Sequence, residues 1–335
     1  MKRNLLAIML IFVLLLSMIG CEESNKSNPN SDGEVNGVEE LNLTIGVAPG
    51  PVTYPLAFMA EHSSGIDLRL WQGGEQLTSM ITTKEVQLCS TPINNAILTY
   101  NKGLDIELLM VTVWGMLYIM SADDGLKTLD DLKGKEIAIS GQGGIHDHIF
   151  RHLLMENGIN PDTDLIITYM DMPEASSRLV TGDLKYAVLN EPHSSIVTLN
   201  AQKAGVTLYR GLDLTKEWAK LPGQENIRFP MAGIVVVKDE LTTNKEYMSF
   251  VEEYFNASKW VNNNPDEIGP IVEKHVPWMK AVAVTESIKY ARLEPQMATE
   301  CQTEIEAFFK ELSKNIDAKA FGGKLPDAGF YYQGK

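Results

Sequence analysis

The sequence contains the same strand-to-helix pattern twice, about 100 residues apart. An apolar strand at 86–90 is followed by Thr91-Pro92 and a helix, and a strand at 186–189 is followed by Asn190-Glu191-Pro192 and another helix. Proline is tolerated where a helix begins, because its missing N–H would have no partner there. The repeat predicts two copies of one α/β scheme, in which ligands bind at the carboxyl ends of the strands.

A glycine-rich loop begins the first helix of the second copy. The stretch 129–157 contains a short apolar strand at 136–140, a loop at 141–144, and apolar residues at helical spacing from Ile145. Such a loop leaves N–H groups and the positive end of a helix dipole facing a ligand with acceptor atoms. The loop has neither a Walker sequence nor the dinucleotide fingerprint. A plain tight turn is the alternative interpretation.

The remaining elements follow the same alternation. We expect further strands at 41–47, 66–71, 104–113, 165–169, 206–209 and 234–237, and further helices at 54–61, 75–83, 173–181, 213–221, 247–261, 285–293 and 298–312. We expect the strand at 234–237 to rejoin the first sheet, so that two crossovers form a hinge. The predicted lobes are 41–120 plus 228–335, and 121–227, with a loose tail from Gly322.

The N-terminus has the composition of an export signal. Lys2 and Arg3 precede an apolar run, and Gly20 precedes Cys21. Residues 1–20 therefore predict a signal peptide, and Cys21 resembles the lipidated cysteine of a bacterial lipobox, which would carry a palmitate-type anchor. An uncleaved anchor helix and a plain signal peptide are the alternatives. Residues 21–40 are polar and predict a flexible tether, so we expect a body held at the outer face of a membrane.

Charge and cysteine content limit the possible partners. The chain has 335 residues and a net charge of −15; removing residues 1–20, which include Lys2 and Arg3 but no acid, gives −17. Such an acidic protein is not expected to bind nucleic acid. Cys89 and Cys301 could pair in an oxidising compartment; two buried thiols are the alternative.

Several short motifs together resemble one family, the substrate-binding lipoproteins of ABC importers in the nitrate, sulfonate, taurine and thiamine-precursor group. The resemblance covers about 41–255 and rests on Gly50-Pro51 with Tyr54-Pro55, Gly73-Gly74, residues 90–96, 100–103, Trp114-Gly115, residues 129–135, 141–144 and 190–192. It implies an α/β type II periplasmic-binding-protein fold: two lobes, a two-segment hinge, and closure around a small solute. It also implies an ABC importer permease as partner, a monomeric chain and no cofactor.

The resemblance places the solute contacts on the loops between strands and helices. The implied contacts are Pro51, Val52, Thr53, Gly73, Gly74, Thr91, Asn94, Trp114, Gly115, Gln142, Gly143, Gly144, His146, Asp171, Met172, Asn190 and Glu191. For each polar residue a helix cap or turn is the alternative role. For Trp114 the alternative to stacking on a planar ligand is a place in the core.

Two other functions were weighed. His148 and His152 are one helical turn apart, but the intervening residues lack the glutamate of a zinc-protease helix, and no further His or Cys cluster supplies a third ligand; we therefore expect no metal. The same fold hosts a pyrimidine synthase and menaquinone-pathway enzymes, so an enzyme acting on a small heterocycle or menaquinone precursor is the alternative function. The synthase's cysteine-rich motif and a nucleophile–base set are missing from this sequence.

The expected solute is a sulfonate or a neutral heteroaromatic compound. No Arg or Lys occurs at the tips of the matched loops, and Arg228 near the hinge is the closest cation. This argues against a doubly charged anion. It leaves a sulfonate held by backbone N–H groups, or a heteroaromatic vitamin precursor stacked on Trp114 or Tyr54.

Overall fold

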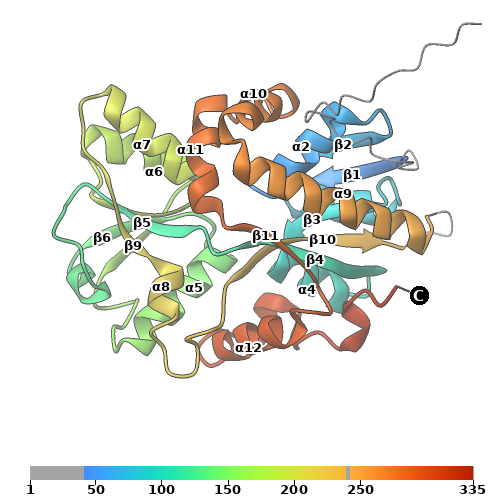
Figure 1. Ribbon diagram of the computed structural model, residues 1–335. Coiled ribbons are helices and arrows are strands. Elements are labelled where there is room, and N and C mark those ends of the chain that lie inside the picture. The colour runs from blue at the N-terminus through green and yellow to red at the C-terminus, as the bar shows by residue number, and fades with distance from the viewer. Residues whose placement is uncertain (1–40, 239–241, 335) are drawn as a thin grey trace, which may run out of the picture. The chain divides into compact units, whose positions relative to one another are not determined.

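The computed structural model of the protein describes residues 41–238 and 242–334. Its strands form two sheets flanked by helices (Figure 1), as the α/β prediction requires. The six-stranded sheet has the order β11-β4-β10-β3-β1-β2. Its strands are β1 (Leu43–Val47), β2 (Ile66–Leu70), β3 (Leu88–Pro92), β4 (Ile106–Trp114), β10 (Pro230–Val237) and β11 (Leu293–Met297).

The second sheet has five strands in the order β7-β6-β8-β5-β9. They are β5 (Leu117–Ser121), β6 (Glu136–Ile139), β7 (Ile166–Tyr169), β8 (Tyr186–Asn190) and β9 (Tyr209–Asp213). Because β5 begins at Leu117, the second sheet starts slightly before the lobe boundary that we predicted at residue 120. The lobe ranges themselves remain a prediction.

Two segments connect the sheets. Gly115 and Met116 link β4 to β5, and α8 (Leu214–Trp218) lies on the return path from β9 to β10. The late strand pairs with both β3 and β4 in the first sheet, which confirms the predicted double crossover.

The strand directions place the loops that follow β1, β3, β6 and β8 near these crossovers. β10 leads away from the crossover and is antiparallel to β3 and β4, while β3 is parallel to β1. β5 also leads away from the crossover and is antiparallel to β8, which is parallel to β6. The carboxyl ends of β1, β3, β6 and β8 therefore all point toward the crossover region, where open α/β sheets bind their ligands.

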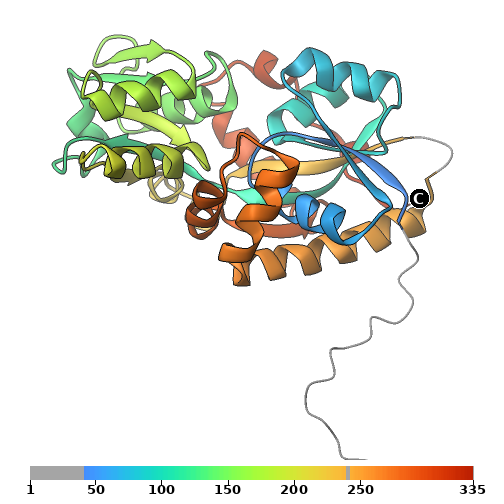
Figure 2. The same cartoon turned by 90° about the horizontal axis from the view of Figure 1, so that it is seen from above.

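Helices cover both faces of the sheets. Figure 2 shows α2, α9 and α10 on one side of the first sheet and α3 and α4 on the other. The helices that have not yet been bounded are α2 (Thr53–His62), α3 (Gly74–Thr82), α4 (Ile93–Asn101), α5 (Ile145–Glu156), α6 (Met172–Thr181), α7 (His193–Lys203), α9 (Asn244–Asn263), α10 (Pro265–His275), α11 (Ala281–Ala291) and α12 (Gln302–Leu312). All eight residues of β10 are buried, as expected for a central strand covered on both faces.

The structure corrects one expected element and adds two that were not predicted. The strand expected at 206–209 is β9, which begins at Tyr209 and pairs with β5. The edge strand β11 was not predicted, because Pro295 within it is a residue that strands tolerate only at sheet edges. The helix α10 was also missed, although Pro265 at its first turn is a helix-start signal.

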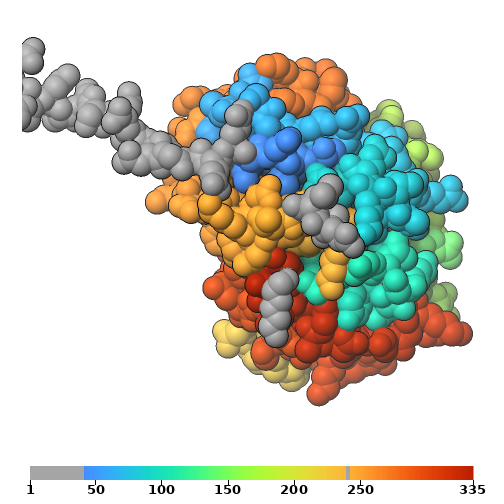
Figure 3. Space-filling view, turned by 90° about the vertical axis from the view of Figure 1, so that its right-hand side faces the viewer, coloured from blue at the N-terminus to red at the C-terminus, as the bar shows by residue number. Residues whose placement is uncertain are grey.

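The C-terminal segment is not the loose tail that we expected. Phe330 and Tyr331 are fully buried, and the Tyr332 N–H donates to the Leu108 carbonyl at 3.0 Å. In Figure 3 the red C-terminal segment lies on the same face as α9. Buried aromatic side chains explain why this segment is held against the first sheet.

The signal peptide, Cys21 and the tether lie outside the described residues. Cys89 and Cys301 are both buried and free, so the buried-thiol alternative holds. In the part of the chain that the structure describes, no helix combines the length and the apolarity needed to cross a membrane.

Candidate functional site

The loop after β1 is tied together by its own hydrogen bonds. Pro51, Val52 and Thr53 are buried. The Thr53 hydroxyl donates to the Ala48 carbonyl at 2.7 Å, and the Tyr254 hydroxyl donates to the Val52 carbonyl at 3.0 Å. The polar groups of this loop therefore stabilise its conformation, and its side chains can offer mainly apolar contacts to a ligand.

Tyr54 follows this loop and is fully buried. Its hydroxyl lies 2.7 Å from the Ser287 hydroxyl on α11. Burial raises the pKa of Tyr54, and the nearby Glu191 carboxylate raises it further. The phenol is therefore neutral. Tyr54 lies close enough to the end of β8 for the Glu191 carboxylate to affect its pKa.

Asn94 offers an unused acceptor at the start of α4. Its Nδ2 donates to Asn95 Oδ1 at 3.2 Å, which fixes the amide orientation. Its Oδ1 is buried and has no hydrogen-bond partner among the described residues. Thr91, just before it, is also buried. Buried polar atoms are normally paired, so this orphaned oxygen is the kind of group that a ligand satisfies.

The end of β8 repeats this feature in the second sheet. Asn190 Oδ1 is likewise buried without a partner in the described ranges. Glu191, next to it, is instead fully engaged: its carboxylate accepts from Arg210 Nη2 at 2.8 Å and from the Ser195 hydroxyl at 2.7 Å. Burial raises the pKa of Glu191, and the Arg210 guanidinium opposes that rise. Glu191 therefore has a structural partner, whereas Asn190 does not.

Two histidines meet near these ends. Part of the surface of His146 stays accessible, but burial, together with the nearby His193, lowers its pKa to about 4. Burial lowers the pKa of His193 to about 4 as well. The His193 ring stacks on Trp278, with centroids 5.9 Å apart, and its Nδ1 is buried without a partner within residues 41–238 and 242–334. Both imidazoles are therefore neutral near pH 7.

The sequence analysis did not select His193. It begins α7 directly after Pro192, so its place beyond a strand end in the repeated pattern was a usable signal. The partner Trp278 could not be found in the same way, since it comes from the distant segment between α10 and α11.

The glycine loop uses its amides internally. The Gly143 N–H donates to Asp147 Oδ2 and the Gly144 N–H donates to the Gly141 carbonyl, both at 2.8 Å. Gln142 and Gly143 are exposed. A Cβ at Gly144 would lie 2.9 Å from the Gly141 carbonyl oxygen. An alanine at Gly144 would therefore distort the loop itself and would not report on ligand contact alone.

Asp147 anchors the loop and was missed by the sequence analysis. It is 2% exposed and also accepts from Arg151 Nε at 3.1 Å and from the Tyr169 hydroxyl at 3.0 Å. A buried carboxylate with this many donors is a rigid anchor. Nothing in its sequence context distinguished it from an ordinary helix residue.

Trp114 and Gly115 lie in the hinge. Trp114 is 1% exposed, its Nε1 donates to the Glu294 carbonyl, and the Arg228 guanidinium carbon lies 3.8 Å from its ring centroid. The ring face that we expected to stack on a solute is thus covered by a cation. Gly115 has φ +89°, and a Cβ there would collide with Arg292 and Thr215.

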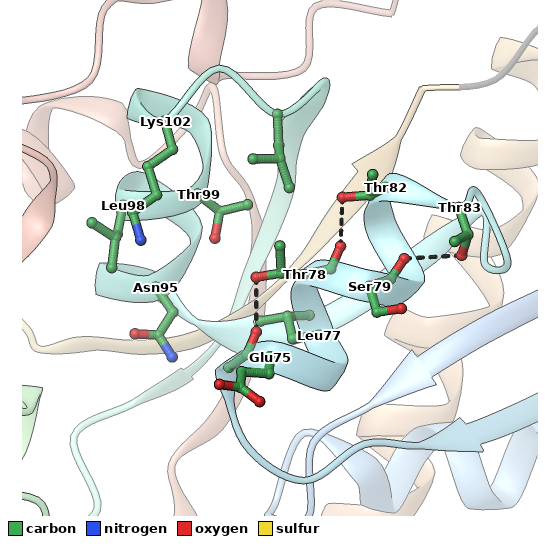
Figure 4. Close-up of a pocket in the computed structure, with 12 residues that line it drawn as sticks. Glu75, Leu77, Thr78, Ser79, Thr82, Thr83, Asn95, Leu98, Thr99 and Lys102 are labelled. Carbon is green, nitrogen blue, oxygen red and sulfur yellow. Dashed lines mark hydrogen bonds between the residues drawn. The ribbon is translucent and has the colours of Figure 1, made fainter.

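Gly73, Gly74 and Asp171 are exposed. Asp171 caps α6 by accepting from the Glu174 N–H. Gly74 borders a cavity of about 720 Å³ between α3 and α4 (Figure 4). Three threonine hydroxyls on its α3 side donate to carbonyls of their own helix or its last turn. These three hydroxyls are therefore engaged within the protein and do not act as the free polar groups that a solute site needs.

A smaller cavity borders His193. Its volume is about 370 Å³, and α6, α7 and Trp278 line it. His193 and Ser176 both contribute to this lining, and Ser176 Oγ is buried without a partner among the described residues. This cavity, unlike the one between α3 and α4, thus borders unsatisfied polar atoms.

Three arginines near the crossovers are paired with carboxylates. Arg210 contacts Glu191, Arg228 contacts Glu304 at 2.8 Å, and Arg292 contacts Asp213. The unsatisfied atoms of Asn94 and Asn190 are acceptors. The arrangement therefore favours a ligand that donates hydrogen bonds over one that brings strong negative charge.

The comparisons with known proteins agree with this architecture. A family model described as NMT1/THI5 like matches residues 62–268. No curated protein matches the chain in sequence. An ABC transporter structure from Parabacteroides distasonis is 21% identical, covers 88% of this chain and 99% of its own, and has a TM-score of 0.72.

Two sulfonate-binding proteins also match in structure. The periplasmic aliphatic sulphonate-binding protein SsuA from Escherichia coli is 15% identical, with 85% of this chain and 92% of that chain covered and a TM-score of 0.61. The alkanesulfonate-binding protein SsuA from Xanthomonas axonopodis pv. citri, bound to MOPS, is 15% identical, with 83% and 96% covered and a TM-score of 0.57. The predicted type II periplasmic-binding-protein fold is therefore confirmed.

Proposed function

Because the chain belongs to the NMT1/THI5-like family, we propose that it captures a small solute outside the cytoplasm and delivers it to the permease of an ABC importer. The shared fold with an ABC transporter structure and with two sulfonate-binding proteins supports this role. We propose a binding protein rather than an enzyme, acting as a monomer and without a cofactor.

The solute site that we propose lies at the carboxyl ends of β1, β3, β6 and β8. Asn94, Asn190 and His193 supply its polar contacts, and Tyr54, His146 and the apolar loop after β1 form its walls. In this proposal Glu191, Gly115 and Trp114 do not contact the solute. Glu191 pairs with Arg210, and Gly115 and Trp114 shape the hinge.

The observation that carries the proposal is the group of buried, unpartnered atoms at the two matching strand ends. Asn94 Oδ1 and Asn190 Oδ1 can only accept hydrogen bonds, and the neutral His193 ring offers a third polar atom at Nδ1. Leaving such atoms unpaired costs roughly 1–3 kcal/mol each. A solute with N–H donors would remove that cost, so we propose a neutral, nitrogen-rich heteroaromatic compound rather than a sulfonate.

The test combines ligand identification with one pair of variants. Small molecules that copurify with the protein should be released by denaturation and identified by mass spectrometry. Thermal shifts with an aminopyrimidine, an alkanesulfonate and nitrate then rank the classes, since a ligand stabilises by RT ln(1 + [L]/Kd). The Asn94→Ala variant should lose affinity by roughly 5-fold to 150-fold.

The matched control is Asn256→Ala, because Asn256 is exposed on α9. It should bind like the wild type. A stronger thermal shift with the alkanesulfonate than with the aminopyrimidine would contradict the proposed solute class. Equal affinities of the Asn94→Ala and wild-type proteins would remove the β3 end from the site.

We also propose that residues 1–20 are cleaved, that Cys21 is lipidated, and that residues 21–40 tether the body to the membrane. The apolar run after Lys2 and Arg3 and the Gly20-Cys21 pair support this. A lipid anchor would keep the protein near its permease and raise the effective concentration of the loaded form there.

A further inference from the structure

Three potential metal ligands converge between α5 and α12. His152 and Glu156 are one helical turn apart on α5, and Glu311 comes from α12. One ligand atom from each of the three lies within 4.8 Å of the other two. We expected no metal because no further His or Cys cluster supplies a third ligand; Glu156 lies one turn along α5 from His152, and the fold adds Glu311.

One nitrogen of the His152 imidazole, Nε2, is buried beside this cluster and is unpaired among the described residues. His152 is 0% exposed. Nε2 lies 3.7 Å from Glu311 Oε1, which is too long for a hydrogen bond. The ring is held from the other side by Trp218, with centroids 5.0 Å apart, so it cannot turn away easily.

The surroundings carry an excess of negative charge. The Glu311 side chain is 8% exposed, and it accepts from Gln224 Nε2 at 3.0 Å and from Lys314 Nζ at 2.7 Å. Lys314 itself is 56% exposed, so its ammonium can move to solvent at little cost. The two carboxylates and the imidazole would then face one another, and a divalent cation between them would neutralise the negative charge of the carboxylates.

We propose that His152, Glu156 and Glu311 bind a divalent first-row transition-metal ion, such as Zn²⁺, between α5 and α12. Imidazole and carboxylate ligands suit this class of ion. Zn²⁺ takes nitrogen and oxygen ligands at about 2.0–2.2 Å, so the exposed Glu156 side chain must move inward, and water would complete the coordination. The ion would link α5, which follows β6 of the second sheet, to α12, which follows β11 of the first sheet.

Asn315 is suited to support the ligands. Its Nδ2 donates to Glu156 Oε1 at 2.7 Å and lies 3.1 Å from His152 Nδ1. Because an amide N–H₂ only donates, Nδ1 is the acceptor and the proton is on Nε2. Metal binding through Nε2 moves that proton to Nδ1, and the Asn315 amide turns over so that Oδ1 accepts it. Outer hydrogen bonds of this kind orient metal-binding histidines.

The test uses chelator-treated protein titrated with Zn²⁺ in competition with a chromophoric chelator, and with Co²⁺ read by visible absorption. We expect one equivalent of Zn²⁺ and a Co²⁺ spectrum that changes with the ligand set. Glu156→Gln should weaken Zn²⁺ binding by about tenfold or more, the loss that even an outer-sphere partner causes. Glu252→Gln on α9 carries the same charge change and should bind like the wild type.

A second pair of variants tests whether the Lys314 ammonium competes with the metal for Glu311. This test does not depend on Glu156. Lys314→Gln should tighten Zn²⁺ binding, because it removes the cation that occupies Glu311. Lys310→Gln, at an exposed position on α12 four residues before Lys314, is its control. Less than one equivalent of Zn²⁺ bound by the wild type at micromolar concentration would overturn the proposal. Equal binding by Glu156→Gln and Glu252→Gln, or equal tightening by both lysine variants, would overturn it too, since general attraction to an acidic surface would then explain the binding.

Discussion

The guanidinium carbon of Arg210 lies 3.6 Å from the ring centroid of Tyr290. Arg210 belongs to β9 of the second sheet, and Tyr290 belongs to α11, which precedes a strand of the first sheet. The same guanidinium pairs with the fully buried Glu191. One side chain therefore neutralises a carboxylate behind the proposed site and also holds the two halves of the fold together.

Removing this cation should destabilise the protein strongly. In Arg210→Met the Glu191 carboxylate would remain buried without its counter-charge, which costs about 3–5 kcal/mol. Adding Glu191→Gln should recover part of the loss, because the buried group is then neutral. Urea unfolding of the two single variants and the double variant measures the coupling.

The control for this prediction is an exposed ion pair. Lys133 and Asp130 lie 2.7 Å apart, with side chains 48% and 67% exposed. Lys133→Met should change the free energy of unfolding by about 1 kcal/mol or less. A similar loss in Lys133→Met and Arg210→Met would show that burial does not govern the Arg210 pair.

Acid should destabilise the protein through His146 and His193. Burial lowers the pKa of both to about 4 in the folded state, below the value of about 6.5 in the unfolded chain. The unfolded chain then binds more protons between these values, so stability falls as the pH drops from about 6.5 to 4 and levels off below that. The loss should be on the order of 2–3 kcal/mol per histidine.

The His193→Gln variant isolates this effect from the titration of carboxylates. It should show a weaker decrease in unfolding free energy between pH 7 and pH 4 than the wild type. His62→Gln, at an exposed position on α2, should follow the wild-type curve. Parallel curves for His193→Gln and wild type would contradict the assignment of the decrease to His193.

The sequence predicted the architecture well because the pattern was local and repeated. Apolar runs bounded by Pro92 and Pro192 marked two strand ends, and the structure has β3 and β8 there. β11 was not predicted, because Pro295 within it argues against a strand. The segment is a strand because it pairs with β4 at the edge of the sheet.

The candidate site was only partly predictable. Asn94 and Asn190 could be selected, because both follow strand ends in the repeat. The Arg228 side chain over Trp114, the Trp278 ring on His193 and the approach of Glu311 to His152 could not. Each of these contacts joins residues far apart in the chain, so no local pattern encodes it.

The cysteines provide a direct test of export. Cys89 and Cys301 are 0% and 4% exposed, so neither should react quickly with a thiol reagent in the folded protein. Chain processed and lipidated at Cys21 should yield two reactive thiols after denaturation, and Cys21→Ala should leave the body soluble after signal cleavage. Membrane fractionation with thiol counting measures both, and a processed Cys21→Ala protein that stays in the membrane fraction would rule out the lipid anchor.

Asp147 and Asp162 both contact Arg151, but they should differ sharply in importance. Asp147 is buried and also accepts from the Gly143 N–H and the Tyr169 hydroxyl. Asp162 contacts Arg151 Nη1 at 2.8 Å, and its side chain is 72% exposed. In Asp147→Asn, one acceptor oxygen and an N–H₂ group would face three donors, so at least one partly buried donor would lose its partner.

Asp147→Asn should therefore lower the free energy of unfolding by about 1–3 kcal/mol, whereas Asp162→Asn should change it by about 1 kcal/mol or less. Urea unfolding gives both values, and hydrogen exchange at the Gly143 amide reports the loop directly, since loss of its acceptor should raise the exchange rate. If the loop borders the proposed solute site, Asp147→Asn should also weaken solute binding at temperatures where the protein remains folded. Unchanged exchange at Gly143 together with an unchanged free energy of unfolding in Asp147→Asn would mean that another group holds this loop.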